Sequence, residues 1–170
     1  DTAPKGGELV GNVYAVSSTS EFKVEGAVYD KKDDQWDYGE RPVVEVELSA
    51  KDGYYFSSTK RSIFSLTGCG AQFKTAEKDG DGSALILQVY LPAIDGNLPV
   101  TTSVSWNQTT AVWDKVNGSK NYEVRLYRDK KLVTTQKTSE STYDFSSYIN
   151  VEGNYTFTVR ALGTYSSQAG

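Results

Sequence analysis

The side chains most able to bind a ligand lie together in one polar loop, residues 30–40, which reads DKKDDQWDYGE. They are three carboxylates and two aromatic rings: Asp33, Asp34, Asp37, Trp36 and Tyr38. Hard carboxylate oxygens this close in sequence could coordinate Ca²⁺. An exposed indole beside the acids could instead stack on a sugar ring, while the carboxylates hydrogen-bond the sugar hydroxyls. The third alternative is a solvated loop whose Trp36 folds back onto the protein.

Catalytic chemistry is strongly limited by composition. The chain has no histidine and one cysteine, Cys69, so it can form no Ser-His or Cys-His nucleophile pair and no zinc site with a histidine ligand. Two carboxylates about 5–9 Å apart could hydrolyse a glycosidic bond. No pattern singles out such a pair among the 16 acidic residues of positions 1–99. We therefore expect a protein that is not an enzyme and has no resident metal or cofactor, with Ca²⁺ as the one alternative.

Two other groups of residues are better explained as structure. Asp79-Gly80-Asp81-Gly82 resembles half of an EF-hand loop, but position 12 of that loop would be Tyr90 instead of glutamate. An Asp-Gly step between two apolar runs predicts a tight hairpin turn. Tyr54, Tyr55 and Phe56 follow a Lys-Asp-Gly turn and begin an extended run, in which neighbouring side chains point to opposite faces.

The charge distribution indicates two units and disfavours some partners. Residues 1–99 carry 10 Lys/Arg and 16 Asp/Glu, a net of −6, whereas residues 100–170 carry 8 and 6, a net of +2. A mildly acidic chain without a basic stripe disfavours nucleic acid as a partner. No apolar run approaches the roughly 20 residues of a membrane span, so we expect none.

Alternating apolar and polar residues predict an all-β fold of antiparallel strands. Clear examples are EFKVEGAVYD, PVVEVELSA, NYEVRLY, KLVTTQKT and NYTFTVRAL. The run DGNLPV at 95–100 combines turn residues with the change in charge. We expect an N-terminal β-sandwich of about seven strands at residues 1–97 and a second β-sandwich at residues 98–170.

The alternation also predicts the core of the second domain. The inward positions are expected to be Trp113, Tyr122, Val124, Tyr155, Phe157 and Val159.

Residues 100–163 resemble a fibronectin type III (immunoglobulin-like) module, on the basis of Trp113 in TAVWDKV, the NYEVRLY strand and NYTFTVRA. The resemblance implies that Trp113 packs between two sheets. It also implies that Tyr155 is the corner tyrosine, whose hydroxyl bonds to a backbone group. Only TYSSQAG follows Gly163, so the last strand is expected to be short or truncated.

The order of RPVVEVELSAKDGYYF, SALILQVYLPAI, the Trp113 region and YDFSSYI is similar to the paired β-modules of secreted cell-surface proteins from Gram-positive gut bacteria of the Clostridia type. That resemblance implies an extracellular position at the cell surface or cell wall. It implies a non-catalytic spacer or interaction module of the kind used in adhesion. The implied partners are neighbouring modules of the same polypeptide, or a cell-wall or host glycan or protein. A carbohydrate-binding module that uses the Trp36 loop is the alternative.

Overall fold

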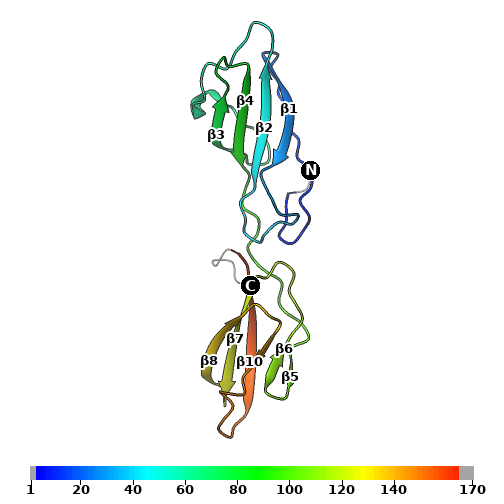
Figure 1. The fold of residues 1–170 in the computed structure, drawn as a ribbon, viewed down its shortest axis with the longest axis vertical. Helices are drawn as coiled ribbons and strands as arrows, with labels where there is room; N and C mark the ends of the chain where they lie inside the picture. The colour runs from blue at the N-terminus through cyan, green and yellow to red at the C-terminus, as the bar shows by residue number, and fades with distance from the viewer. Residues whose placement is uncertain (1–2, 165–170) are drawn as a thin grey trace. The chain divides into compact units, whose positions relative to one another are not determined.

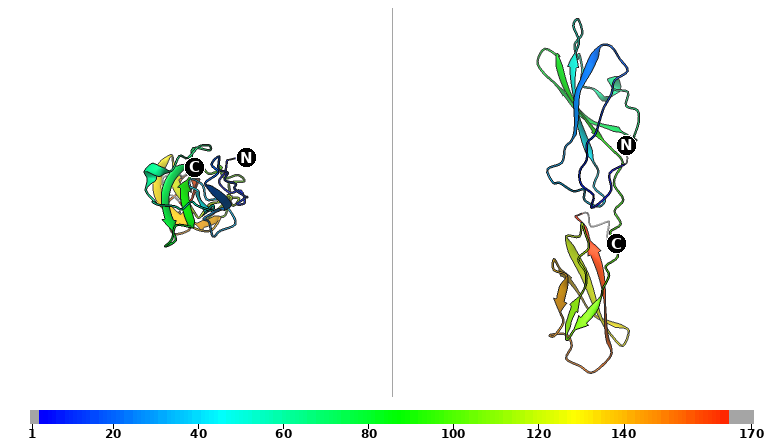
Figure 2. Two further views of the ribbon diagram at one scale, coloured as in Figure 1. Left: turned by 90° about the horizontal axis from the view of Figure 1, so that it is seen from above. Right: turned by 90° about the vertical axis from the view of Figure 1, so that its right-hand side faces the viewer.

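A computed structural model describes residues 3–164 and contains almost only β-structure, with one three-residue 3-10 helix, η1 (Arg61–Ile63). All of its strand pairs are antiparallel, as expected. The chain divides into two compact units, and Figures 1 and 2 draw the strands of each. Within the described part of the chain, no helix is long and apolar enough to span a membrane.

The first unit is built on one four-stranded sheet, with the strand order β1-β2-β4-β3. Its strands are β1 (Phe22–Tyr29), β2 (Val43–Ala50), β3 (Gln72–Lys78) and β4 (Ala84–Tyr90). Alternate side chains of the two central strands form the core: Val44, Val46, Leu48, Leu85, Leu87 and Val89. The period-two alternation of the sequence therefore places one apolar face of the sheet inward.

Extended segments without strand partners supply the rest of this core. Residues 10–16, 54–60 and 64–71 contain no assigned strand, although Val13, Phe56 and Phe64 pack against the core cluster. The first unit thus has four strands among its described residues, where the sequence predicted about seven in two sheets. The prediction was wrong on this point because alternating burial requires only an extended chain, whereas a strand also requires a hydrogen-bonded neighbour.

The predicted hairpin at residues 79–83 is confirmed, since β3 and β4 pair on either side of it. Ser83 fastens the turn: its hydroxyl donates to Asp79 Oδ2 at 2.7 Å, and its N–H donates to Asp81 Oδ1 at 2.9 Å. Gly82 has φ +77°, and a Cβ there would lie 2.7 Å from the carbonyl oxygen of Phe56. These carboxylates therefore organise a turn.

The second unit contains two three-stranded sheets that share one core. The first has the order β10-β7-β8, and the second has the order β5-β6-β9. The strands are β5 (Ser105–Asn107), β6 (Thr110–Val112), β7 (Asn121–Arg128), β8 (Lys131–Thr138), β9 (Thr142–Asp144) and β10 (Tyr155–Leu162).

The expected core residues of this unit differ in how deeply they are buried. Trp113, Tyr122 and Val124 are buried in the shared core. Tyr155, Phe157 and Val159 are only partly buried, and the buried core also contains Ala111, Leu126, Phe145 and Ala161. The difference follows from strand position, because β7 is central in its sheet whereas β10 is at the edge.

Two tyrosine hydroxyls bond to backbone groups in this unit. The buried Tyr122 hydroxyl accepts the N–H of Val116 at 2.8 Å and the hydroxyl of Ser119 at 2.8 Å. The Tyr155 hydroxyl donates to the carbonyl of Val151 at 2.8 Å. Tyr155 thus makes the type of backbone bond that its sequence context implied.

The boundaries of the units differ from a single division after residue 97. The second unit begins at Asp95, and it also includes residues 5–7 and 37–40 from the first half of the chain. The chain therefore enters the second unit twice before residue 95. Sequence composition reveals a change near residues 95–100, but it does not reveal short segments that pack with distant residues.

Replacing Tyr122 by phenylalanine should destabilise the second unit by about 1–3 kcal/mol, because the buried N–H of Val116 loses its acceptor. Tyr155→Phe is the matched control. The carbonyl that it releases belongs to Val151, which is 54% exposed and can bond to water. Urea denaturation of both variants tests this difference, and equal losses of stability would contradict it.

Asp144 should contribute to acid sensitivity of the second unit. Hydrogen bonds from the Ser146 N–H, the Ser146 hydroxyl and the Thr109 hydroxyl lower the pKa of Asp144 from its ordinary 3.8. A lowered pKa gives stability that is present above the unfolded-state value and is lost as pH falls through the folded-state value. Thermal melts from pH 7 to pH 2 should therefore show a decline below about pH 4 that is smaller in Asp144→Asn. An identical decline in both proteins would show that Asp144 contributes nothing.

Candidate functional site

Trp36, the main candidate for sugar stacking, is buried in the first unit. Its side chain is 3% exposed. The ring of Tyr29 meets the indole edge-on with centroids 4.8 Å apart, and the ammonium of Lys31 lies 5.8 Å from the indole centroid. Of the three alternatives for this loop, the structure thus agrees with the one in which Trp36 folds back onto the protein: the indole has no open face on which a sugar ring could stack.

Backbone contacts hold Trp36 in this position. Its N–H donates to the carbonyl of Glu8 at 2.9 Å, and Leu9 forms an isolated bridge with Gln35. The N–H of Val10 donates to the carbonyl of Asp34 at 2.8 Å. The loop is thus tied to residues 8–10, and the apolar indole follows the chain into the core.

Tyr38, the second aromatic candidate, packs against the core of the second unit. Its ring lies between glycines at positions 6, 7 and 118. An added Cβ at Gly6 would lie 2.5 Å from Tyr38 Cδ1, and one at Gly118 would lie 2.6 Å from Tyr38 Cε2. A Cβ at Gly7 would lie 3.2 Å from the Tyr38 hydroxyl oxygen. We call Gly6, Gly7 and Gly118 the Tyr38 clasp, because only residues without a side chain allow the ring to fit.

Polar contacts fasten the segments that carry the Tyr38 clasp. The side-chain amide of Asn117 donates to the carbonyl of Gly7 at 3.3 Å. The N–H of Gly39 donates to the carbonyl of Asp95 at 3.1 Å. The ammonium of Lys120 lies 3.6 Å from Asp37 Oδ1. Tyr38 is therefore held by its neighbours on both sides, as well as by its ring.

The three candidate carboxylates do not come together as a metal site. Asp33 and Asp34 are exposed in the first unit, whereas Asp37 belongs to the second. Asp33 lies 3.6 Å from the Lys31 ammonium. Among residues 3–164 there is no group of three or more acidic, histidine or cysteine side chains placed to hold a metal ion. The loop thus offers no preformed arrangement of oxygen ligands for Ca²⁺.

The other aromatic cluster is divided between surface and core. Tyr54 and Tyr55 are 52% and 69% exposed. Phe56 instead packs on the first-unit core, with its ring centroid 5.8 Å from that of Phe22. The two tyrosines are the aromatic residues of this cluster that a partner could contact.

On the polar face of β7 and β10 in the second unit, charged side chains form ion pairs with one another. Glu123 Oε1 lies 2.8 Å from the Arg125 guanidinium and 3.7 Å from that of Arg160. A hollow of about 250 Å³ lies beside them. One carboxylate thus offsets part of the positive charge of both arginines.

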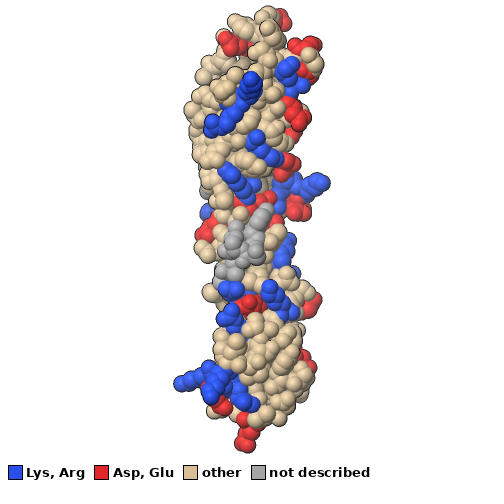
Figure 3. All heavy atoms as spheres, turned by 90° about the vertical axis from the view of Figure 1, so that its left-hand side faces the viewer, with Lys and Arg blue, Asp and Glu red and all other residues tan. Residues whose placement is uncertain are grey.

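On the face drawn in Figure 3, positive and negative side chains are interspersed over the first unit.

Adding a methyl group at position 118 should destabilise the second unit. Gly118 has φ +79°, and its new Cβ would overlap the Tyr38 ring at 2.6 Å. Strain and overlap together should cost Gly118→Ala about 2–4 kcal/mol in free energy of unfolding. Gly53→Ala is the matched control, because Gly53 has φ +86° with nothing within 4 Å of the added atom. Chemical denaturation should show the larger loss at position 118, and equal losses would exclude a steric role for Tyr38.

The two aromatic side chains among the candidates, Trp36 and Tyr38, therefore serve in packing. Comparison of the chain with protein-family models, with curated proteins and with solved structures gives no match in any of the three. A function must therefore be argued from the residues of this chain.

Proposed function

We propose that this chain is a non-catalytic spacer and interaction module of a larger extracellular protein at a bacterial cell surface or cell wall. The observation that carries the proposal is that the two aromatic side chains of the Trp36–Tyr38 loop pack within the protein. Trp36 is buried in the first unit, and Tyr38 fills the Tyr38 clasp in the second. The most conspicuous aromatic residues of the loop thus stabilise the two units.

The second unit is proposed to be fibronectin type III-like. Three features support this: two sheets around one core, a buried Trp113 in that core, and the hydroxyl of Tyr155 bonded to a backbone carbonyl four residues earlier. Modules with this architecture are suited to a spacer, because each encloses its own core and can be joined in series.

The connections of the chain support a load-bearing role. Only Asp37 separates Trp36, whose indole meets the ring of Tyr29 in the first unit, from Tyr38, which packs on the core of the second. The chain passes between units again at residues 40–41 and 94–95. Long flexible linkers extend at low force, whereas such short connections transmit tension directly to packed side chains.

The carbohydrate-binding alternative has lost its main support. It required an exposed indole at Trp36, and that indole is 3% exposed. Tyr54 and Tyr55 are exposed, but single exposed rings are ordinary on a protein surface and do not by themselves indicate a sugar site. We therefore propose no second function.

Pulling the chain by its two ends tests the spacer proposal. The wild type should unfold in discrete force peaks, because each unit has its own packed core. Tyr38→Ala should lower the force of one peak and leave another unchanged, because the ring packs on one core only. Tyr54→Ala, which removes an exposed ring, should change neither peak. Continuous extension at low force in the wild type would contradict a load-bearing role.

A binding assay on glycan arrays and purified cell wall separates the two functions. A spacer should show no saturable binding by the isolated chain. Saturable binding that Tyr54→Ala or Tyr55→Ala abolishes would favour the carbohydrate-binding alternative and overturn the proposal.

A further inference from the structure

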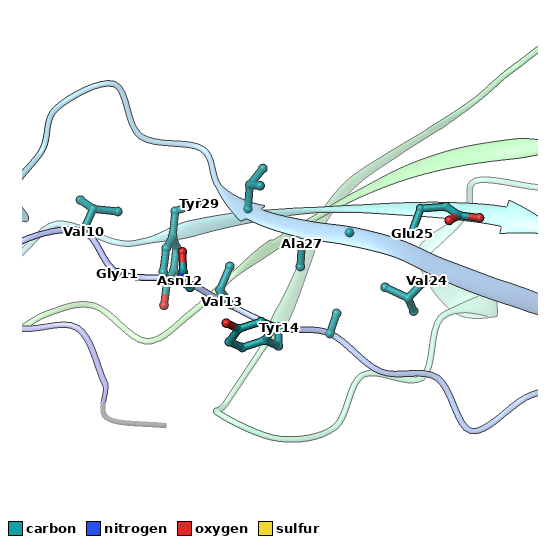
Figure 4. Close-up of a pocket in the computed structure, with 12 residues that line it drawn as sticks. Val10, Gly11, Asn12, Val13, Tyr14, Val24, Glu25, Ala27 and Tyr29 are labelled. Atoms are coloured by element: carbon teal, nitrogen blue, oxygen red, sulfur yellow. The ribbon is translucent and has the colours of Figure 1, made fainter.

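One edge of the first-unit sheet is unpaired. β1 pairs with β2 on one side, and no strand within the described range 3–164 pairs with its other side. Residues 10–15 run along that side, and together with residues 24–29 of β1 they line a pocket of about 660 Å³. Figure 4 shows the two runs, with β1 along one side of the pocket and the extended segment along the other.

The two runs form no hydrogen-bonded ladder along the pocket. Paired strands lie about 4.8 Å apart, which leaves no room for a pocket between them. Within residues 3–164, no backbone hydrogen bond joins the segment 10–15 to β1. The pocket therefore has polar backbone groups along both walls, and the β1 edge is of the kind that pairs readily with another strand.

Residues 10–15 already have the side-chain pattern of a strand. Val13 and Ala15 are partly buried and pack against the first-unit core, whereas Tyr14 is 73% exposed and the next outward residue, Val16, is 95% exposed. Pairing in the wrong register would move apolar side chains to the solvent face. The apolar side chains of this segment that face the core and those that face solvent already alternate as in a paired strand. The segment can therefore approach β1 without rotating about its own axis.

The segment is held at both ends. At one end, Val10 donates its N–H to Asp34, and Leu9 bridges Gln35. At the other end, residues 17–21 form a short connection into β1, with the Thr19 N–H bonded to the Ser17 hydroxyl at 3.2 Å. The segment and β1 are thus consecutive extended runs joined by a short connection, and closing an already short loop costs little additional entropy.

We propose that residues 10–15 are a strap that closes onto β1 as a fifth strand, and that the structure holds this strap open. Antiparallel closure about the 17–21 connection places Val13 opposite Ala27, and both side chains pack against the core. The bulge between Val24 and Gly26 gives β1 one extra residue opposite the end of the strap, next to the 17–21 connection. Closure gives the backbone groups of the β1 edge hydrogen-bonding partners within the same chain.

Cysteine cross-linking tests closure. Residues directly opposite in paired strands have Cα atoms close enough for a disulfide, which requires about 4.4–6.8 Å. In a Cys69→Ser background, which removes the exposed native thiol, the pair Val13→Cys and Ala27→Cys should cross-link with oxidised glutathione. Tyr14→Cys with Ala27→Cys is the matched control, because Tyr14 points outward. We expect the first pair to react at least about tenfold faster, since only its thiols share a face; equal rates would overturn the proposal.

Hydrogen exchange on the unmodified chain gives an independent test. If the strap closes, some amides of residues 10–15 should exchange at least about tenfold more slowly than in an unstructured chain, because closure bonds them to β1. Ala15→Pro removes an N–H and hinders pairing, so it should speed exchange at the neighbouring strap amides. Exchange of all strap amides at the rate of an unstructured chain would overturn the proposal, whatever the cross-linking result.

Discussion

The fit of one tyrosine ring among three glycines is the constraint on which the second unit depends. Tyr38 comes from a loop in the first half of the sequence, yet its ring lies where a Cβ of Gly6 or Gly118 would otherwise be. A protein interior is close-packed, so a ring in such a place leaves little freedom for its neighbours. The hydrogen bonds from Asn117 to Gly7 and from Gly39 to Asp95 then hold the contributing segments.

This constraint changes the interpretation of the acidic loop. An aromatic residue among carboxylates resembles a sugar-binding surface, but the same composition serves a loop that inserts its rings and leaves its acids in water. Trp36 and Tyr38 are inserted, while Asp33 and Asp34 are exposed. Lys31 offsets the charge of Asp33, and Lys120 offsets that of Asp37. The acids thus face water or form ion pairs that fasten the loop.

Much of the fold could be predicted from the sequence, because it depends on local alternation. The runs around Val24, Val46, Val124 and Val159 each became a strand, and the Asp-Gly steps became a hairpin. Segment 10–16 shows where this reasoning ends, because alternation predicts an extended chain but does not supply its hydrogen-bonding partner. Trp36 could not be placed for a similar reason: its burial depends on Tyr29 and Glu8, which the local sequence does not identify as neighbours. The glycine pair at residues 6–7 leaves room for a close approach, but the local sequence does not identify the approaching group, which is the Tyr38 ring.

The position of the Tyr38 ring can be measured directly by nuclear magnetic resonance of the whole chain. If the loop serves packing, the ring protons of Tyr38 should show nuclear Overhauser effects to the α-protons of Gly6 and Gly118, and those α-protons should have ring-current shifts. Absence of these effects, together with the shifts of a tyrosine in water, would contradict the account and return the loop to the candidates for ligand binding.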